Sequence, residues 1–485
     1  MLLIRLAIIA SLVVAVALIT GLVVSQHPPF LLLGALAALV IFTLSFLNTE
    51  AGLYILVFSM LLSPEIVVSG VGGGSALGRG VTIRLDDLLL VIIGFSWFAK
   101  TAFHKELGLF LRTPLNRPVF YYVIVCLLAT GVGIIAGRVA PKTGFFFTLK
   151  YFEYFIVFFM VTNLLETTQQ MKRLLFCMFL TCIIVCVVGM LQIPGGGRVS
   201  APFEGETGEP NTFGGYLVFM GALAAGLLST ASDKNVRWFL IGVLLFIIPP
   251  FLYTESRSSY LAAIPAALVF GFLSNKKAIV IGLILAGLAV SPLLLPANVI
   301  ERITYTYKQR YHPGQHVEIA GVRLDTSLSA RLISWRKGLG GWTHHPILGH
   351  GVSGFAFMDA QFPRVLVETG ILGLIAFFYI LYSIFRLAFI NLQRVSDPFN
   401  RGLIKGFLAG YVGLLFHAIG ANTFIIVRIM EPFWFVVGML AILPELEAAE
   451  NQDATMAGLD TGGGRDRRPL SDRLPIPYGG RHLLP

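Results

Sequence analysis

Charge is scarce in this chain of 485 residues. Only 13% of the residues are Asp, Glu, Lys or Arg, whereas 56% are hydrophobic. Soluble domains carry about 25% charged residues, so the chain has roughly half of the charge that a water-facing surface normally uses. This shortage excludes an ordinary soluble domain and favours a protein that resides in a lipid bilayer.

Cysteine and the motifs of nucleotide and metal chemistry are also nearly absent. All four cysteines lie inside apolar runs, a placement that indicates neither a disulfide framework nor a metal site. The chain has no Gly-x-x-x-x-Gly-Lys-Ser/Thr phosphate loop and no His-Glu-x-x-His motif. His344, His345 and His350 have no carboxylate set beside them, so we expect neither a metal nor a cofactor.

Apolar runs of about 20 residues, the length that crosses a hydrocarbon core, recur along the chain. The alternating pattern of a membrane β-barrel is absent, so we expect an all-α integral membrane protein with about 12–14 transmembrane helices. The expected spans are 2–24, 29–48, 51–63, 86–104, 118–137, 145–165, 173–193, 212–230, 237–253, 258–273, 277–295, 365–387, 402–421 and 425–444.

These spans divide the chain into four parts. Residues 1–295 form an N-terminal transmembrane bundle, 296–364 a long basic extracytoplasmic loop, 365–446 the C-terminal transmembrane helices and 447–485 a disordered tail. Within the long loop, the helical spacing of apolar residues over 329–340 predicts an amphipathic helix. Leu332, Trp335 and Leu339 would form its buried side.

The distribution of Lys and Arg among the short loops predicts the orientation of the chain. The richer set of loops lies near 100–117, 172–173, 234–237, 276–277 and 386–405. Because the richer set faces the cytoplasm, the N-terminus and, with an even number of spans, the C-terminus are expected there. Long loops escape this rule, so the basic loop can lie outside. The net charge of +10 therefore needs no nucleic-acid partner.

The outer-face loops collect arginines that suit a phosphate ligand, because a guanidinium matches phosphate oxygens with two hydrogen bonds. Arg257 is the most informative, since it begins a span beside Glu255. The alternative is that these arginines contact anionic lipid headgroups or extend toward the membrane surface.

Several ionisable residues fall inside the expected spans, where they are costly unless they are paired or functional. We expect them in the outer half of the bundle, either as ion pairs at helical spacing or as the floor of one shared cavity. They are Lys150 and Glu153, Arg428 and Glu431, His417, and Glu368.

Four short motifs in order resemble those of the O-antigen ligase and O-antigen polymerase superfamily. Gly208–Phe213 is similar to an outer-loop Pro-Asn motif, and Ser256-Arg257 to a Ser-Arg motif. The long-loop signature is matched by Arg331-x-x-x-Trp335 and His345-Pro346-x-x-Gly349-x-Gly351, and the segment that closes the loop by Asp359–Gly373. The matches cover roughly residues 200–375.

The resemblance implies a GT-C-like, metal-independent glycosyltransferase of the bacterial inner membrane. Its donor would be a glycan on undecaprenyl diphosphate and its acceptor another glycan, with a chain-length regulator and a flippase as further partners. The candidate substrate-binding residues are Arg257, Arg331, Arg336, Arg364, Lys150, Glu209, Asn211, His345 and Glu368.

The chain departs from the family at Asp359-Ala360, where ligases typically carry His-Asn. Asp359 is then the candidate general base, and the departure favours a polymerase of O-antigen or exopolysaccharide over a lipid-A-core ligase. Alternatively, Asp359 pairs with Arg364 and only fixes the end of the loop. A transporter or flippase of lipid-linked sugars is the rival function, and internal repeats or broken helices would favour it. A structural membrane protein would leave the basic loop unexplained.

Overall fold

The computed structural model describes residues 29–67, 82–103, 113–202, 208–274, 326–356 and 358–459, with residue pairs at 277–278, 281–282, 318–319 and 322–323. The expected span 2–24, nearly all of the expected span 277–295 and the last part of the tail, 460–485, lie outside these residues.

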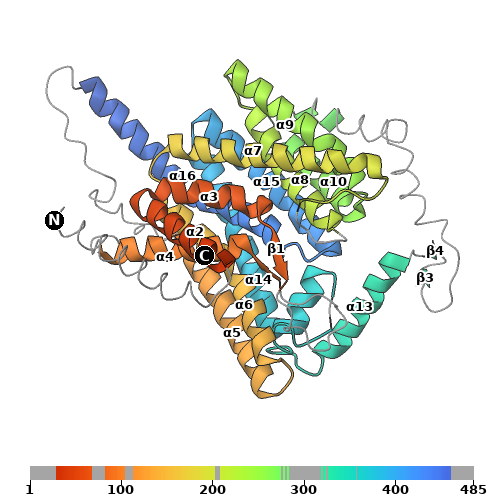
Figure 1. Ribbon diagram of the computed structural model, residues 1–485. Coiled ribbons are helices and arrows are strands. Elements are labelled where there is room, and N and C mark those ends of the chain that lie inside the picture. The colour runs from red at the N-terminus through yellow and green to blue at the C-terminus, as the bar shows by residue number, and fades with distance from the viewer. Residues whose placement is uncertain are drawn as a thin grey trace, which may run out of the picture.

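Helices make up almost all of the described structure (Figure 1). Twelve of them correspond to expected spans, and eight are long and apolar enough to cross a membrane. The expected all-α integral membrane fold is thereby confirmed. The twelve are α2 (Pro29–Leu47), α3 (Thr49–Leu62), α4 (Leu85–Phe103), α5 (Asn116–Ile135), α6 (Pro141–Leu164), α7 (Thr168–Gln192), α8 (Pro210–Leu228), α9 (Lys234–Tyr253), α10 (Arg257–Leu273), α14 (Gln361–Arg394), α15 (Pro398–Gly420) and α16 (Val427–Leu459).

Short elements connect these helices. Strands β1 (Glu65–Val67) and β2 (Thr82–Arg84) form an antiparallel pair between α3 and α4. Strands β3 (Glu318–Ile319) and β4 (Val322–Arg323) form another pair in the long loop, and η1 (Ile193–Gly195) extends α7.

The expected amphipathic helix in the long loop is present as α13 (Thr326–Trp342), which packs against α14 (Figure 1). Its buried side differs from the expectation, because Leu339 is 48% exposed. Gly338 is buried instead, and a Cβ atom there would lie 2.5 Å from the methyl group of Met358. The absence of a side chain at Gly338 therefore lets α13 approach the end of the long loop closely.

Several helices extend beyond the hydrophobic runs because polar residues cap their ends. Thr167 and Gln170 form a capping box before α7, five residues upstream of the expected span. The expected tail boundary at 447 is wrong, since α16 continues to Leu459. Glu447 is buried, and its carboxylate accepts hydrogen bonds from Ser396, Asp397 and Asn400 in the α14–α15 turn.

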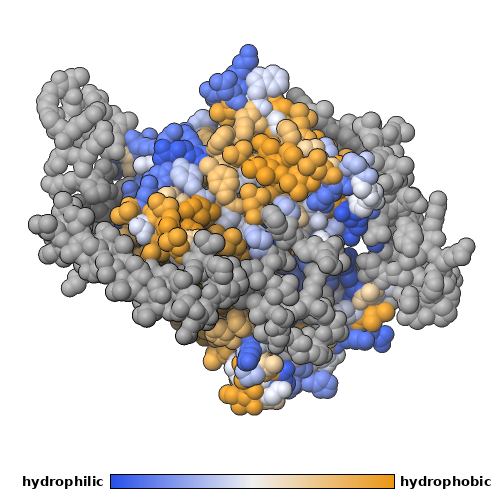
Figure 2. Space-filling view, viewed as in Figure 1, coloured by the Kyte–Doolittle hydropathy of each residue, from blue (hydrophilic) through white to orange (hydrophobic). Residues whose placement is uncertain are grey.

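The tightest helix packing joins α8 and α15. A Cβ atom at Gly226 would lie only 2.4 Å from the backbone of Gly406, so both positions need glycine. In contrast, α9 lies at the periphery, with Trp238, Leu245 and Ile248 exposed. Figure 2 shows broad hydrophobic areas on the surface, as expected where helices face lipid hydrocarbon.

Candidate functional site

Three loops meet at the ends of α7, α8, α9 and α10, and Arg198 joins them. Its Nε atom donates to the carbonyl oxygen of Thr254 at 3.0 Å. Its Nη2 atom lies 3.4 Å from the side-chain oxygen of Asn211 and 3.4 Å from the carbonyl oxygen of Glu255. The Pro-Asn and Ser-Arg motifs are therefore neighbours in space. The sequence pattern did not identify Arg198 as a site residue, because it belongs to none of the four motifs.

The start of α10 holds Arg257 at the edge of this site. Ser256 caps the helix and accepts hydrogen bonds from the backbone N–H of Ser259 at 3.2 Å and from the Ser259 hydroxyl at 2.7 Å. Glu255 has a positive φ of 48°, an uncommon conformation that turns the chain sharply between α9 and α10. Arg257 follows as the first, half-buried residue of the helix.

The start of α8 lies beside it. Glu209 precedes α8, and its carboxylate accepts a hydrogen bond from Thr212 at 2.9 Å. Gly214 gives α8 its close approach to α10, because a Cβ atom there would lie 2.3 Å from the Ser259 hydroxyl oxygen. Two helix N-termini thus point to one place, and the partial positive charge of such ends favours anions.

A buried polar chain lies beneath the two N-termini. His417, on α15, is fully buried. Its Nε2 atom lies 3.2 Å from the Ser259 hydroxyl oxygen, and its Nδ1 atom lies 2.8 Å from that of Thr423. His417 therefore lies beneath the start of α10 and joins it to the end of α15.

Asp359 and Arg331 form the other side of the site. The Arg331 Nη2 atom lies 3.6 Å from a carboxylate oxygen of Asp359, and the two side chains are 21% and 43% exposed. Partial burial raises the pKa of the Asp359 carboxyl, and the charge of Glu209 adds to this, outweighing the attraction of Arg331 and Arg364.

The backbone around Asp359 is fixed by the turn between α15 and α16. Asn422 donates to the carbonyl oxygen of Met358 at 2.7 Å, and the side-chain oxygen of Gln361 accepts from the backbone N–H of Phe424 at 3.0 Å. Both contacts are long-range in sequence, so no local pattern indicated them.

The His-Pro-x-x-Gly-x-Gly motif donates hydrogen bonds to backbone groups beside a break in α14. Gly370 has φ 67° and ψ −167°, which interrupts the helix and frees backbone groups on either side. The backbone N–H groups of His350 and Gly351 donate to the carbonyl oxygens of Val367 and Glu368 at 2.9 and 2.8 Å. A Cβ atom at Gly349 would lie 2.5 Å from the Val367 carbonyl oxygen, so glycine is required for this approach.

Glu368 is enclosed by donors. Its carboxylate accepts from Arg364 Nε at 3.1 Å, from the Tyr151 hydroxyl at 2.8 Å and from the Ser353 backbone N–H at 3.3 Å. Both Arg364 and Glu368 are buried. The salt bridge of Arg364 is thus with Glu368 and that of Asp359 is with Arg331, in place of the Asp359–Arg364 pair considered from the sequence.

Lys150 belongs to a separate ionic cluster on α4, α6 and α16. Its Nζ atom lies 2.5 Å from Asp87 and 3.5 Å from Glu153. Glu431 is fully buried, and among the described residues neither of its carboxylate oxygens has a hydrogen-bond partner. Arg428 donates to the carbonyl oxygens of Leu61, Ser63 and Pro202. The printed contacts of Lys150 and Arg428 are thus separate from those of His417 and of Glu368.

Two further candidate residues lie apart from Asp359. Arg336 is exposed, and at 100° per residue it lies about 140° around α13 from Arg331. The imidazole of His345 lies 2.7–3.0 Å from Arg138 Nη1 and packs edge-on against His350.

A comparison with protein families agrees with this arrangement. Residues 242–378 match the family model described as O-antigen ligase. The match runs from α9 to α14 and contains Ser256-Arg257, Arg331 and Asp359. No curated protein matches the chain. This segment of an all-helical integral membrane protein therefore resembles the O-antigen ligase and polymerase superfamily.

Proposed function

We propose that the protein is a membrane glycosyltransferase that polymerises or ligates undecaprenyl-diphosphate-linked oligosaccharides on the outer face of the bacterial cytoplasmic membrane. The O-antigen ligase family match supports a membrane glycan ligase or polymerase in general. The observation that carries the finer proposal is the meeting of motifs far apart in sequence around a partly exposed Arg331–Asp359 pair.

The donor diphosphate binds near Arg257. Arg198 and Arg331 add positive charge, and the N-termini of α8 and α10 add oriented N–H groups. Such fixed donors stabilise charge that develops on a leaving group without reorganising during the reaction. The diphosphate gains negative charge as it departs, so its stabilisation by these groups accelerates transfer.

Asp359 acts as the general base. Its carboxylate accepts the proton of an acceptor hydroxyl, whose oxygen forms a bond to the anomeric carbon of the donor sugar. The bond from that carbon to the phosphate oxygen breaks, and undecaprenyl diphosphate leaves with the electron pair. A carboxylate base on the face opposite the leaving group inverts the anomeric configuration. The raised pKa of Asp359 makes it a stronger base than an exposed aspartate.

The acceptor is another lipid-linked glycan, which makes the reaction a polymerisation. This choice rests on Asp359-Ala360 in place of the His-Asn typical of ligases. A chain-length regulator and a flippase are the further partners that this role needs.

The proposed orientation is the one that the Lys/Arg distribution predicts, with the long loop outside and both ends of the bundle in the cytoplasm. Thr343 is exposed at the end of α13, so a cysteine introduced there reacts with an impermeant thiol reagent in intact spheroplasts. Reaction only after lysis would reverse the topology.

Transfer itself is tested in proteoliposomes that contain the purified protein and a defined undecaprenyl-diphosphate oligosaccharide. The expected result is a ladder of longer lipid-linked glycans that Asp359→Asn does not form. Movement of the lipid-linked sugar across the bilayer without elongation would instead support the transporter.

A further inference from the structure

The turn between α15 and α16, residues 421–426, lies between two halves of the candidate site, one at the start of α10 and one around Asp359. Gly420, the last residue of α15, borders both halves. Its carbonyl oxygen accepts from the Ser258 hydroxyl of α10 at 3.4 Å, and a Cβ atom on it would lie 3.4 Å from Arg331 Nη1. The turn is buried or half-buried throughout, so packing fixes its position.

Asn422 and Phe424 of this turn hold the segment that carries Asp359. The Asn422 amide donates to the carbonyl oxygen of Met358 at 2.7 Å, and the backbone N–H of Phe424 donates to the Gln361 side chain at 3.0 Å. The two bonds bracket Asp359, since one ends at the residue before it and the other ends two residues after it. The turn therefore sets the position of the Asp359 backbone.

Thr423 reaches the start of α10 through His417 and Ser259. The Ser259 hydroxyl donates to the Ser256 oxygen at 2.7 Å, so toward His417 Nε2, 3.2 Å away, it accepts. Nε2 then carries the hydrogen of the buried imidazole, and Nδ1 accepts from the Thr423 hydroxyl at 2.8 Å. One chain of hydrogen bonds thus runs from the turn to the N-cap of α10, directly before Arg257.

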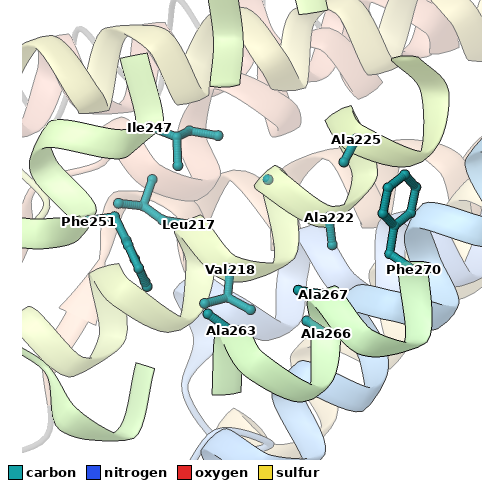
Figure 3. Close-up of a pocket in the computed structure, with 11 residues that line it drawn as sticks. Leu217, Val218, Ala222, Ala225, Ile247, Phe251, Ala263, Ala266, Ala267 and Phe270 are labelled. Carbon is teal, nitrogen blue, oxygen red and sulfur yellow. The ribbon is translucent and has the colours of Figure 1, made fainter. Parts of the chain in front are cut away.

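On its side toward α9, α10 is joined to a peripheral helix. The Tyr260 ring packs against Phe251, and its hydroxyl donates to the carbonyl oxygen of Leu252. One turn further along α10, Ala263 faces an apolar pocket between α8, α9 and α10 (Figure 3). Because α9 is only 22% buried, these contacts hold α10 to a helix that faces lipid. They do not reach the aspartate half of the site.

We infer that the α15–α16 turn positions the start of α10 relative to Asp359, with Asn422 and Thr423 as the positioning residues. The inference rests on the proposed function, because that function assigns the donor diphosphate to Arg257 and removal of the acceptor proton to Asp359. Neither positioning residue touches the substrate. Asn422 acts through the loop end, and Thr423 acts through the hydrogen-bond chain to α10.

The proposed reaction explains why the two halves need a common support. The diphosphate leaves one face of the donor sugar while the acceptor oxygen attacks the other, so the groups on both faces must be in place together. A displacement of about 1 Å between such groups lowers a rate about a hundredfold. The start of α10 and the end of the long loop are far apart in sequence, and the turn contacts both.

Asn422→Leu tests the aspartate half. Leucine has nearly the shape of asparagine but donates no hydrogen bond to Met358. We expect the kcat of transfer to fall about ten- to a hundredfold, because Asp359 loses its fixed position. The KM for the lipid-linked donor should stay near that of the wild type, since the start of α10 keeps its own contacts. Both constants are measured in proteoliposomes.

Asn391→Leu is the matched control. Asn391 is buried near the far end of α14, and its amide donates to the carbonyl oxygen of Leu440 on α16 at 2.6 Å. The substitution removes the same kind of bond from a similar environment, so both variants should lower the unfolding temperature by a similar amount. Asn391→Leu should keep the wild-type kcat. Equal kcat values in the two variants would overturn the positioning role of Asn422.

Thr423→Val and Thr423→Ser test the α10 half, and they are milder changes should Asn422→Leu fail to fold. Valine keeps the shape of threonine and removes the hydroxyl from His417 Nδ1, whereas serine keeps the hydroxyl. Thr423→Val should raise the KM for the lipid-linked donor roughly two- to tenfold, the equilibrium effect of one hydrogen bond. Thr423→Ser should restore the wild-type KM. A serine variant as impaired as the valine variant would contradict the hydrogen-bond chain.

Binding of undecaprenyl diphosphate to the purified protein gives a readout without turnover. Thr423→Val should weaken this binding and Thr423→Ser should not. Wild-type transfer together with wild-type constants in Asn422→Leu and Thr423→Val would overturn the inference and leave the proposed function standing. A wild-type protein that transfers no glycan would remove the proposed function, and equal binding by the two Thr423 variants would then overturn the inference as well.

Discussion

The Arg364–Glu368 pair is buried and enclosed, whereas the Arg331–Asp359 pair is loose and partly exposed. Glu368 accepts three hydrogen bonds, and its side chain is only 6% exposed. Asp359 keeps 43% of its side chain exposed, and Arg331 lies 3.6 Å away. The two carboxylates are only nine residues apart, yet Glu368 is enclosed by three donors whereas Asp359 has acceptor capacity left for a substrate.

The difference separates a structural role from a chemical one. Breaking a buried ion pair leaves a desolvated charge and costs about 3–5 kcal/mol. An exposed pair contributes only about 0–1 kcal/mol to folding. Stability therefore does not explain why an aspartate lies beside Arg331. We therefore expect substitution of Asp359 to lower the transfer rate and substitution of Glu368 to lower the stability.

Asp359→Asn should have the largest effect. The amide keeps the shape of the side chain but accepts no proton, so glycan transfer should fall by about two to four orders of magnitude. The thermal unfolding temperature in detergent should stay near that of the wild type. Transfer is measured as the initial rate of elongation in proteoliposomes. An Asp359→Asn protein that elongates at the wild-type rate would exclude Asp359 as the base.

Glu368→Gln should show the reverse pattern. It removes the negative charge beside the buried Arg364 guanidinium, and we expect a loss of about 3–5 kcal/mol in the free energy of unfolding. The measurement is the unfolding temperature of the purified protein, together with its yield. A stable Glu368→Gln protein with no transfer would move Glu368 from the structural pair into the reaction.

Much of this contrast is invisible in the sequence. Both carboxylates stand near an arginine along the chain, and Arg364 lies closer to Asp359 in sequence than Arg331 does. The choice of partner is made by α13, which brings Arg331 to Asp359, and by Tyr151 of α6, which binds Glu368. Sequence spacing identifies candidates within one helix but does not report contacts between distant helices.

The membrane helices were predictable because hydrophobic length reports the bilayer directly. Twelve expected spans correspond to helices. The end of α16 was missed because Glu447 and its polar neighbours resemble a tail, whereas the carboxylate is buried against the α14–α15 turn. The role of Gly349 was likewise not evident, since it depends on the break at Gly370 across the loop.

Replacing Arg257 should lower the kcat/KM of transfer less than replacing Asp359 does, but more than replacing an exposed arginine does. A hydrogen bond to a charged group contributes about 1.5–3 kcal/mol, so Arg257→Ala should lower kcat/KM by roughly ten- to a hundredfold. Arg257→Lys should recover little of this, because lysine lacks the planar fork. Arg336→Gln is the matched control, since Arg336 is exposed on α13. Equal losses in both variants would indicate a general effect of surface charge.

The smallest effect concerns pH. Partial burial holds the pKa of Asp359 above the ordinary value of about 3.9. Because the base must be ionised, transfer should decline as the pH falls through this raised pKa. The stability contribution of the same group has the opposite sign. It is present in full below the unfolded-state pKa and is lost as the pH rises through the folded-state pKa.

Arg331→Gln makes this pH dependence specific. The positive charge of Arg331 lowers the pKa of Asp359, so its removal should move the acid limb of the rate profile to higher pH. The rate near neutral pH then measures what Arg331 contributes to donor binding. The position of the acid limb measures its effect on the pKa of Asp359. Initial rates measured from about pH 4, near the ordinary aspartate pKa, to about pH 8 separate the two. An acid limb that does not move in Arg331→Gln would assign the titration to a group other than Asp359.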